Sequence, residues 1–163
     1  MAGSIFPAVA LLSVLAGCQQ ASEDRNAQLE RIVQKYAKEE HLERLRAVFV
    51  VTEEGCPSCN KAFAKMVEHH LQDTTVLFWV SAMGSGVDIS PFREAAERVV
   101  WDYDDCMPGS GLLAGSGAIV LDDGRIDTVV QFNNARTLSG SLSYLADLLR
   151  SQRSDSLGGT LEQ

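Results

Sequence analysis

Two cysteines separated by two residues, in Cys56-Pro57-Ser58-Cys59, offer the clearest chemistry in this sequence. Pro57 suits the first turn of a helix, because its missing N–H is not needed there. The unpaired N–H groups at a helix N-terminus carry partial positive charge, which stabilises a thiolate on Cys56. Cys59 would lie one turn later on the same helix face, where it resolves a mixed disulfide. The spacing therefore indicates thiol–disulfide exchange.

The residues on either side predict the elements that position this pair. Residues 47–51 are a continuous apolar run rich in β-branched residues, which is typical of a strand buried on both faces. Residues 52–55 form a loop, and apolar residues at helical spacing predict a helix over 60–72. The expected order is a buried strand, a tight loop and a cysteine pair at the start of a helix.

The rest of the chain predicts further strands and helices of the same α/β class. Residues 102–117, which include Cys106, are an irregular Gly-rich stretch. In chain order we expect a second buried strand at 75–80, a helix at 90–98 with Ser90 as N-cap, a brief strand at 99–101, a β-hairpin at 118–132 with its turn at Asp123-Gly124, and a last helix at 138–149.

This order resembles the thioredoxin superfamily over about residues 48–150, and looks most like its exported, membrane-anchored thiol–disulfide oxidoreductases. Besides the cysteine pair, Ala118 to Ile126 is similar to the family hairpin that ends in Asp-Gly-Arg-Ile. The resemblance implies a thioredoxin-like α/β fold, a central mixed sheet flanked by helices. It also implies that Cys56 is the exposed nucleophile and Cys59 the more buried resolving thiol. No cofactor is implied.

Three positions depart from the family pattern. The place of its cis-proline, before the first hairpin strand, is held by Ser116-Gly117. A buried acid often lies six residues before the first cysteine, and Val50 occupies that position. No aromatic residue adjoins Cys56 on its N-terminal side. These departures affect substrate docking and proton transfer more than the fold.

Two functional hypotheses therefore remain open. The first is an oxidoreductase that acts on exported protein thiols or disulfides, in a direction that the sequence leaves open. The second is a non-catalytic thioredoxin-fold lipoprotein in which the Cys56–Cys59 disulfide is structural and the chain serves in binding or assembly. In the first, the residues expected at the substrate groove are Pro57, Ser58, Ser116 and Gly117.

Other residues near the pair carry open alternatives. Cys106 is either a third redox thiol that exchanges with Cys56 or a free, partly buried cysteine. Glu53 and Glu54 would raise the pKa of Cys56 if they pointed toward it. His69 and His70 lie about 15 Å along the helix from Cys59, at 1.5 Å per residue, so we expect no metal site with the pair.

The N-terminus carries the pattern of an exported lipoprotein. Residues 1–20 are uncharged, with a short apolar run at 5–15. Leu15-Ala16-Gly17-Cys18 resembles a bacterial lipobox, which implies cleavage before Cys18 and lipid on its thiol. We expect a signal peptide at 1–17, a tether at 18–25, an amphipathic helix at 26–46, the thioredoxin-like domain at 47–150 and a disordered tail at 151–163. By resemblance to enterobacterial lipoprotein sorting, Gln19 after the cysteine implies the periplasmic side of the outer membrane over the inner membrane, in an organism that has both.

Composition excludes several other classes. The chain of 163 residues has 45% hydrophobic residues and a mean hydropathy of -0.02, which describes one ordinary globular domain. Its net charge of -8 opposes binding to nucleic acid. Gly84-Ser85-Gly86 lacks the lysine and the further glycine of a phosphate loop. The expected partners are proteins with thiols or disulfides, and a membrane through the lipid on Cys18.

Overall fold

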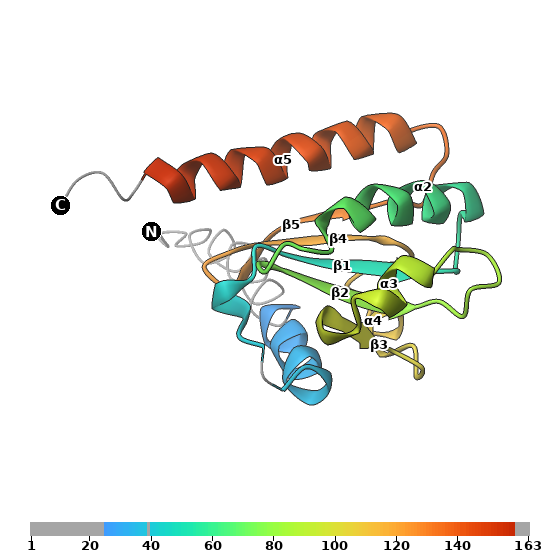
Figure 1. The fold of residues 1–163 in the computed structure, drawn as a ribbon, viewed down its shortest axis with the longest axis horizontal. Helices are drawn as coiled ribbons and strands as arrows, with labels where there is room; N and C mark the ends of the chain where they lie inside the picture. Colours follow the sequence, from blue (N-terminus) through green and yellow to red (C-terminus); the bar gives the residue numbers. More distant parts are fainter. Residues whose placement is uncertain (1–24, 39, 159–163) are drawn as a thin grey trace, which may run out of the picture.

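The computed structural model describes residues 25–38 and 40–158, and its centre is a five-stranded mixed sheet (Figure 1). The strand order is β3-β2-β1-β4-β5. Neighbouring strands β1, β2 and β3 are parallel, whereas β4 runs antiparallel to both β1 and β5. The strands are β1 (Ala47–Thr52), β2 (Val76–Ser81), β3 (Val99–Trp101), β4 (Gly117–Asp122) and β5 (Arg125–Gln131). The expected strands and hairpin are confirmed.

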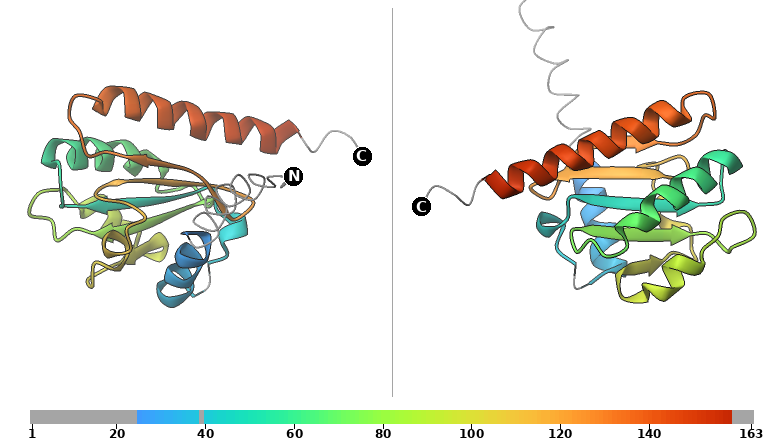
Figure 2. Two further views of the ribbon diagram at one scale, coloured as in Figure 1. Left: turned by 180° about the vertical axis from the view of Figure 1, so that it is seen from behind. Right: turned by 45° about the horizontal axis from the view of Figure 1, so that its top comes forward.

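Helices flank both faces of the sheet (Figure 2). The apolar cluster on one face joins β1 and β2 to α2, α3 and α5. The cluster on the other face joins the same strands to a helix at 25–36 and to α4. The labelled helices are α2 (Pro57–Val67), α3 (Ser90–Glu94), α4 (Cys106–Gly109) and α5 (Leu138–Gly158), with single 3-10 turns η1 (Leu42–Arg44), η2 (Glu68–His70) and η3 (Ala96–Arg98). A mixed α/β fold with a helix-flanked sheet was expected and is present.

Successive side chains of β1 point to opposite faces of the sheet, and helices cover both faces. Residues 47–51 are therefore all apolar. Phe49 packs on the α2 side, where its ring is 6.0 Å from Phe63 and 5.6 Å from Phe78. Val50, the next residue, belongs to the opposite cluster, together with Trp79. All six residues of β1 are buried. A strand covered by helices on both faces has no polar face to present to water.

The helix expected at 26–46 is shorter, because the described helix spans 25–36. Its backbone bonding closes with Ala37 N–H to the Val33 carbonyl at 2.7 Å. Leu42 and Leu45 have helical spacing, but they pack on the sheet from η1 and from the segment that leads into β1. Their apolar character serves the same cluster without continuing the helix.

The last helix is longer than expected, since α5 runs to Gly158. The expectation of a disordered tail from residue 151 is therefore wrong for 151–158, and 159–163 lie outside the described residues. Gln152 Nε2 donates to the Leu121 carbonyl at 3.0 Å, which ties the added turns to β4.

Two smaller differences concern helix starts. The N-cap position of α3 is Ile89 rather than Ser90, and Ser90 N–H donates to Asp88 Oδ1 at 3.0 Å. The stretch expected to be irregular contains α4, which begins at Cys106.

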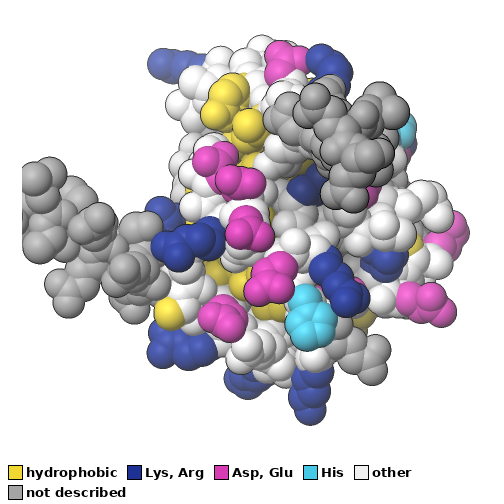
Figure 3. Space-filling view, turned by 90° about the vertical axis from the view of Figure 1, so that its left-hand side faces the viewer, with side chains coloured by type: hydrophobic (Ala, Val, Ile, Leu, Met, Phe, Trp, Pro, Cys, Tyr) yellow, Lys and Arg dark blue, Asp and Glu magenta, His cyan; other side chains and the backbone are white. Residues whose placement is uncertain are grey.

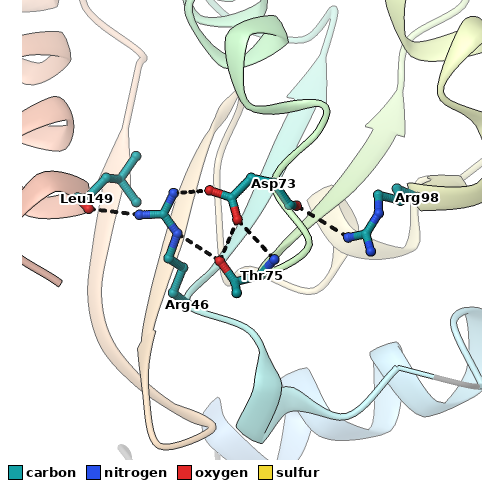
Figure 4. Close-up of polar contacts among 5 residues, drawn as sticks. All are labelled: Arg46, Asp73, Thr75, Arg98 and Leu149. Carbon is teal, nitrogen blue, oxygen red and sulfur yellow. Dashed lines mark hydrogen bonds and ion pairs between the residues drawn. The ribbon is translucent and has the colours of Figure 1, made fainter. Parts of the chain in front are cut away.

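A partly buried ion pair lies where β1 and β2 begin and also binds α5 (Figure 4). Arg46 pairs with Asp73, and its side chain also donates to Thr75 Oγ1 at 2.9 Å and to the Leu149 carbonyl of α5 at 2.8 Å. Arg98 adds a bond to the Asp73 carbonyl at 3.3 Å. Viewed from this end, acidic and basic side chains are interleaved around the surface (Figure 3). We call Arg46, Asp73 and Thr75 the arginine cluster.

Candidate redox site

The cysteine pair lies at the opposite end of the sheet, where β1 ends and α2 begins (Figure 1). Cys56 is the N-cap residue of α2, and Pro57 occupies its first turn, as expected. Cys56 and Cys59 form a disulfide with their Cα atoms 5.2 Å apart. Cys56 is half-buried, whereas Cys59 is 0% exposed. One sulfur of the bond is therefore open to a partner and the other is not.

The start of α2 directs polar groups at the outer sulfur. Cys59 N–H donates to Cys56 Sγ at 3.4 Å, and Ser58 Oγ lies 3.5 Å from the same sulfur. Asn60 N–H donates to the Cys56 carbonyl at 3.0 Å and closes the first turn. Pro57 and Ser58 are exposed beside the sulfur. This arrangement favours a thiolate on Cys56, because donors and the helix N-terminus both face it.

Ser116 and Gly117 lie beside the end of β1 that leads to the pair, and both are buried. The Ser116 hydroxyl accepts from Thr52 N–H at 3.1 Å and donates to the Thr52 carbonyl at 3.2 Å. It continues the pairing of β1 beyond the Val50–Gly117 register position. A Cβ on Gly117 would lie 2.5 Å from the Val130 carbonyl oxygen, so the close approach of β5 requires glycine. Neither residue offers a side chain to a groove, and the described residues contain no cis peptide bond.

Glu53 faces the loop after β2. Its carboxylate accepts from Gly86 N–H at 2.5 Å, Ser85 Oγ at 3.0 Å, Met83 N–H at 3.2 Å and Val87 N–H at 3.3 Å. These bonds, the one from Gly86 foremost, lower the pKa of Glu53 from 4.5 to about 2. The sequence left its direction open, and the structure commits this carboxylate to the loop. The side chain of Glu54 is exposed.

Asn60 is a residue of this site that sequence reasoning missed. It is 0% exposed, and its Nδ2 donates to the Glu54 carbonyl at 2.8 Å, which holds the loop before Cys56 against α2. Its Oδ1 is buried without a hydrogen-bond partner among the described residues. The available signal was a polar residue in the first turn of a helix whose neighbours at 59, 63 and 64 are apolar.

Asp102, also missed, is a carboxylate with 2% exposure just after β3. Burial opposes its ionisation, but four hydrogen bonds outweigh burial and lower the pKa of Asp102. The donors are Trp79 Nε1 at 2.7 Å, Met107 N–H at 2.8 Å, Cys106 N–H at 2.9 Å and Ser81 Oγ at 3.2 Å. Asp102 thus fixes the start of α4 to the ends of β2 and β3.

Cys106 is a free thiol, half-buried, on the other face of the sheet. Its α4 neighbour Met107 packs with the 25–36 helix, whereas Cys59 belongs to the α2 cluster. A hydrogen bond with Cys106 raises the pKa of Tyr36, whose hydroxyl also accepts from Lys35 Nζ at 3.0 Å. The structure therefore brings Cys106 to Tyr36 and separates it from the cysteine pair.

Cavities and ligand groups elsewhere are distinct from the redox pair. A pocket of about 770 Å³ lies at the far end, around the arginine cluster. Over the described ranges, no three His, Cys, Asp or Glu side chains are grouped to hold a metal ion. Within the same ranges no helix combines the length and apolar character needed to cross a bilayer. Cys18 and the expected signal peptide and tether up to residue 24 lie outside the described residues.

Comparison of the chain with protein-family models, with curated proteins and with solved structures finds no match. Its function is therefore argued from the geometry of the cysteine pair.

Proposed function

We propose that this chain is a thiol–disulfide oxidoreductase with a thioredoxin-like fold that acts on exported protein thiols or disulfides. The observation that carries the proposal is the partly buried Cys56 bonded to a fully buried Cys59 at the start of α2. The five-stranded mixed sheet flanked by helices is compatible with that fold. Cys56 is the nucleophile and Cys59 the resolving thiol.

The exchange requires only thiols and disulfides. A substrate thiolate attacks Cys56 Sγ, so that a substrate–Cys56 disulfide forms, the Cys56–Cys59 bond breaks and Cys59 leaves as the thiolate. A second substrate thiolate then attacks the substrate sulfur and releases the Cys56 thiolate. The substrate dithiol loses two electrons and two protons, and the cysteine pair gains them. Every step is reversible, and the relative reduction potentials of the two pairs set the direction.

The surroundings of Cys56 favour its role as the leaving and attacking thiolate. The N–H of Cys59 and the N-terminus of α2 stabilise negative charge on its sulfur. The carboxylate of Glu53 is bonded to the loop after β2. Attack on the buried Cys59 sulfur would require the helix to open, so exchange is directed to Cys56.

The chain is proposed to act at a membrane surface, with lipid on Cys18 after removal of residues 1–17. In a bacterial host, a labelled fatty acid supplied to cells should be incorporated into the chain. The Cys18→Ala variant should lose the label.

The reduction potential of the Cys56–Cys59 pair, measured in glutathione buffers, tests the proposal. A value between roughly −270 and −120 mV means a pair poised for exchange. The Cys59→Ser variant should in addition trap a mixed disulfide with substrate protein, while a Cys56→Ser variant traps none. A potential well below about −300 mV would remove the oxidoreductase proposal.

The second candidate is a non-catalytic binding or assembly protein with a structural disulfide. Ser116 favours it, because its hydroxyl occupies both backbone groups of Thr52 beside the cysteine pair. On that side of β1, neither backbone group of Thr52 is left to pair with a substrate strand. The same potential measurement separates the two candidates.

A further inference from the structure

Two exposed apolar side chains, Met83 and Tyr103, lie near the end of the sheet that holds the cysteine pair. Of the large hydrophobic residues in the described chain, Met83 is 72% exposed, Tyr103 74% and Tyr144 53%. Met83 and Tyr103 line one pocket of about 310 Å³, formed where β2 and β3 end. Its other lining residues are Ala82, Ile89, Arg93 and Trp101. Exposed apolar side chains around one pocket mark an interaction surface.

Met83 and Tyr103 extend from segments that hydrogen bonds to the carboxylates of Glu53 and Asp102 hold in place. Met83 N–H donates to Glu53, which also binds three further groups of the same loop. Tyr103 directly follows Asp102, whose four hydrogen bonds fix its position. The apolar surface is therefore built before a partner arrives, which reduces the entropy lost on binding.

The charge in this pocket limits what it accepts. Arg93 is exposed, and no ion pair or side-chain hydrogen bond engages its guanidinium within the described part of the chain. None of the described residues lining the pocket is acidic. In a chain with a net charge of -8, an apolar pocket whose one charged group is an arginine complements an acidic ligand.

The position of the pocket relates it to Cys56. The loop after β2 and the start of α2 lie at the same end of the sheet (Figure 1). Two strand spacings of about 4.8 Å separate β1 from β3, and an extended chain covers that width in about three residues. A bound polypeptide can therefore reach the pocket and Cys56 together.

We propose that this pocket docks the substrate polypeptide through a large apolar side chain next to an acidic one, about three residues from the cysteine that reacts at Cys56. The inference rests on the proposed function and names the substrate class of that site: extended polypeptide segments with an apolar and an acidic side chain before the reacting cysteine. The peptide thiolate attacks Cys56 Sγ, the mixed disulfide forms, and Cys59 leaves as the thiolate.

Three synthetic peptides test the docking with the full-length oxidised protein. Each carries one cysteine, with Phe-Glu, Phe-Lys or Ser-Ser placed about three residues before it. We expect the Phe-Glu peptide to form the mixed disulfide about tenfold faster than the Ser-Ser peptide, with the Phe-Lys peptide between them. Equal rates for the three peptides would overturn the proposal.

Variants locate the effect. Met83→Ser and Tyr103→Ser should each slow the Phe-Glu peptide about tenfold, and Arg93→Glu should reverse the preference between Phe-Glu and Phe-Lys. Tyr144→Ser, which removes an exposed tyrosine from α5, is the matched control and should leave all rates unchanged. Reduced glutathione, which is too small to reach the pocket, should react with every variant at the same rate.

A binding measurement keeps the docking separate from the chemistry. The Phe-Glu peptide with its cysteine replaced by serine should change the fluorescence of Trp101, which lines the pocket, and Trp101→Phe should abolish that change. Exchange with glutathione but no peptide preference would overturn the docking alone. No exchange with any thiol would overturn the oxidoreductase and this inference with it. A dimer that Met83→Ser converts to a monomer would assign the surface to self-association and overturn the docking.

Discussion

Both ends of the sheet hold partly or fully buried charged groups, and they satisfy them in different ways. At the end where β1 and β2 begin, Asp73 is paired with the opposite charge of Arg46, and Arg46 also binds Thr75, just before β2, and a backbone carbonyl of α5. At the cysteine end, no basic side chain of the described residues pairs with Glu53 or Asp102. Glu53 accepts from three backbone N–H groups and one hydroxyl of the loop after β2. Asp102 accepts from two backbone N–H groups at the start of α4 and from two side chains of β2.

A charged side chain that is shielded from water can therefore serve the fold in two ways, with or without a partner of opposite charge. A side-chain ion pair joins secondary-structure elements to one another, because each partner comes from a different element. A carboxylate that accepts from neutral donors instead holds one segment to a strand end, the loop after β2 for Glu53 and the start of α4 for Asp102, and brings no positive charge to the site. At the cysteine end, positive potential at the sulfur therefore comes from the start of α2. Substitutions of these carboxylates test that distinction.

The largest effect is expected for Asp102→Asn. The NH2 group of asparagine would face either the Cys106 N–H or the Trp79 Nε1 and Met107 N–H, because these donors bind different oxygens of the carboxylate. Either orientation leaves a buried donor unpaired. We expect the free energy of unfolding, measured with urea, to fall by about 3 kcal/mol. Near-ultraviolet circular dichroism of Trp79 should change as well. Asp147→Asn, in an exposed pair with Arg150, is the control and should change stability by less than about 0.5 kcal/mol.

A smaller loss is expected for Asp73→Asn in the arginine cluster. The variant keeps an acceptor for Arg46 but removes its counter-charge, and the pair is only 14% and 15% exposed. Unfolding in urea should require about 2 kcal/mol less. The reduction potential of the cysteine pair should not change, since the cluster lies at the other end of the sheet. A shifted potential would contradict the separation of the two ends.

Much of this fold follows from local sequence patterns, and the exceptions have a common physical cause. β1 and the start of α2 were predictable, because burial on both faces and the Pro57 position leave strong local signals. The ends of the first and last helices were not predictable. Tertiary contacts decide that the first helix stops at residue 36 and that α5 continues to Gly158. Within the site, Cys56 and Cys59 were predictable. The roles of Asn60 and Asp102 depend on partners far along the chain, and no local pattern specifies such partners.

Ser116→Ala probes how β1 ends beside the cysteine pair. Loss of the hydroxyl leaves the N–H and carbonyl of Thr52 without their partner in a buried position. We expect about 1.5 kcal/mol less stability in urea unfolding. Ser116→Thr retains the hydroxyl and serves as the matched comparison. If Ser116→Ala and the wild type have the same free energy of unfolding, water satisfies the N–H and carbonyl of Thr52. Those two backbone groups are then accessible to a substrate strand as well.

The smallest effect is expected for Glu53→Gln, where an amide retains one acceptor for the loop after β2. Near neutral pH we expect a loss of about 1 kcal/mol, measured by urea unfolding. Glu54→Gln, an exposed neighbour, is the matched control and should cost less than about 0.5 kcal/mol.

The pH dependence identifies the carboxylate itself. Folding lowers the pKa of Glu53 from 4.5 to about 2, so its contribution is fully present above pH 4.5 and is lost as the pH falls toward 2. Asp73, with its pKa lowered from 3.8 to about 2, loses its contribution in an overlapping window. Stability of the wild type should therefore fall between pH 4.5 and 2, and Glu53→Gln should lower the slope over that window, while Glu54→Gln should not. An unchanged slope in Glu53→Gln would mean that the loop after β2 is held by other contacts, and the contrast between the two ends of the sheet would then rest on Asp102 alone.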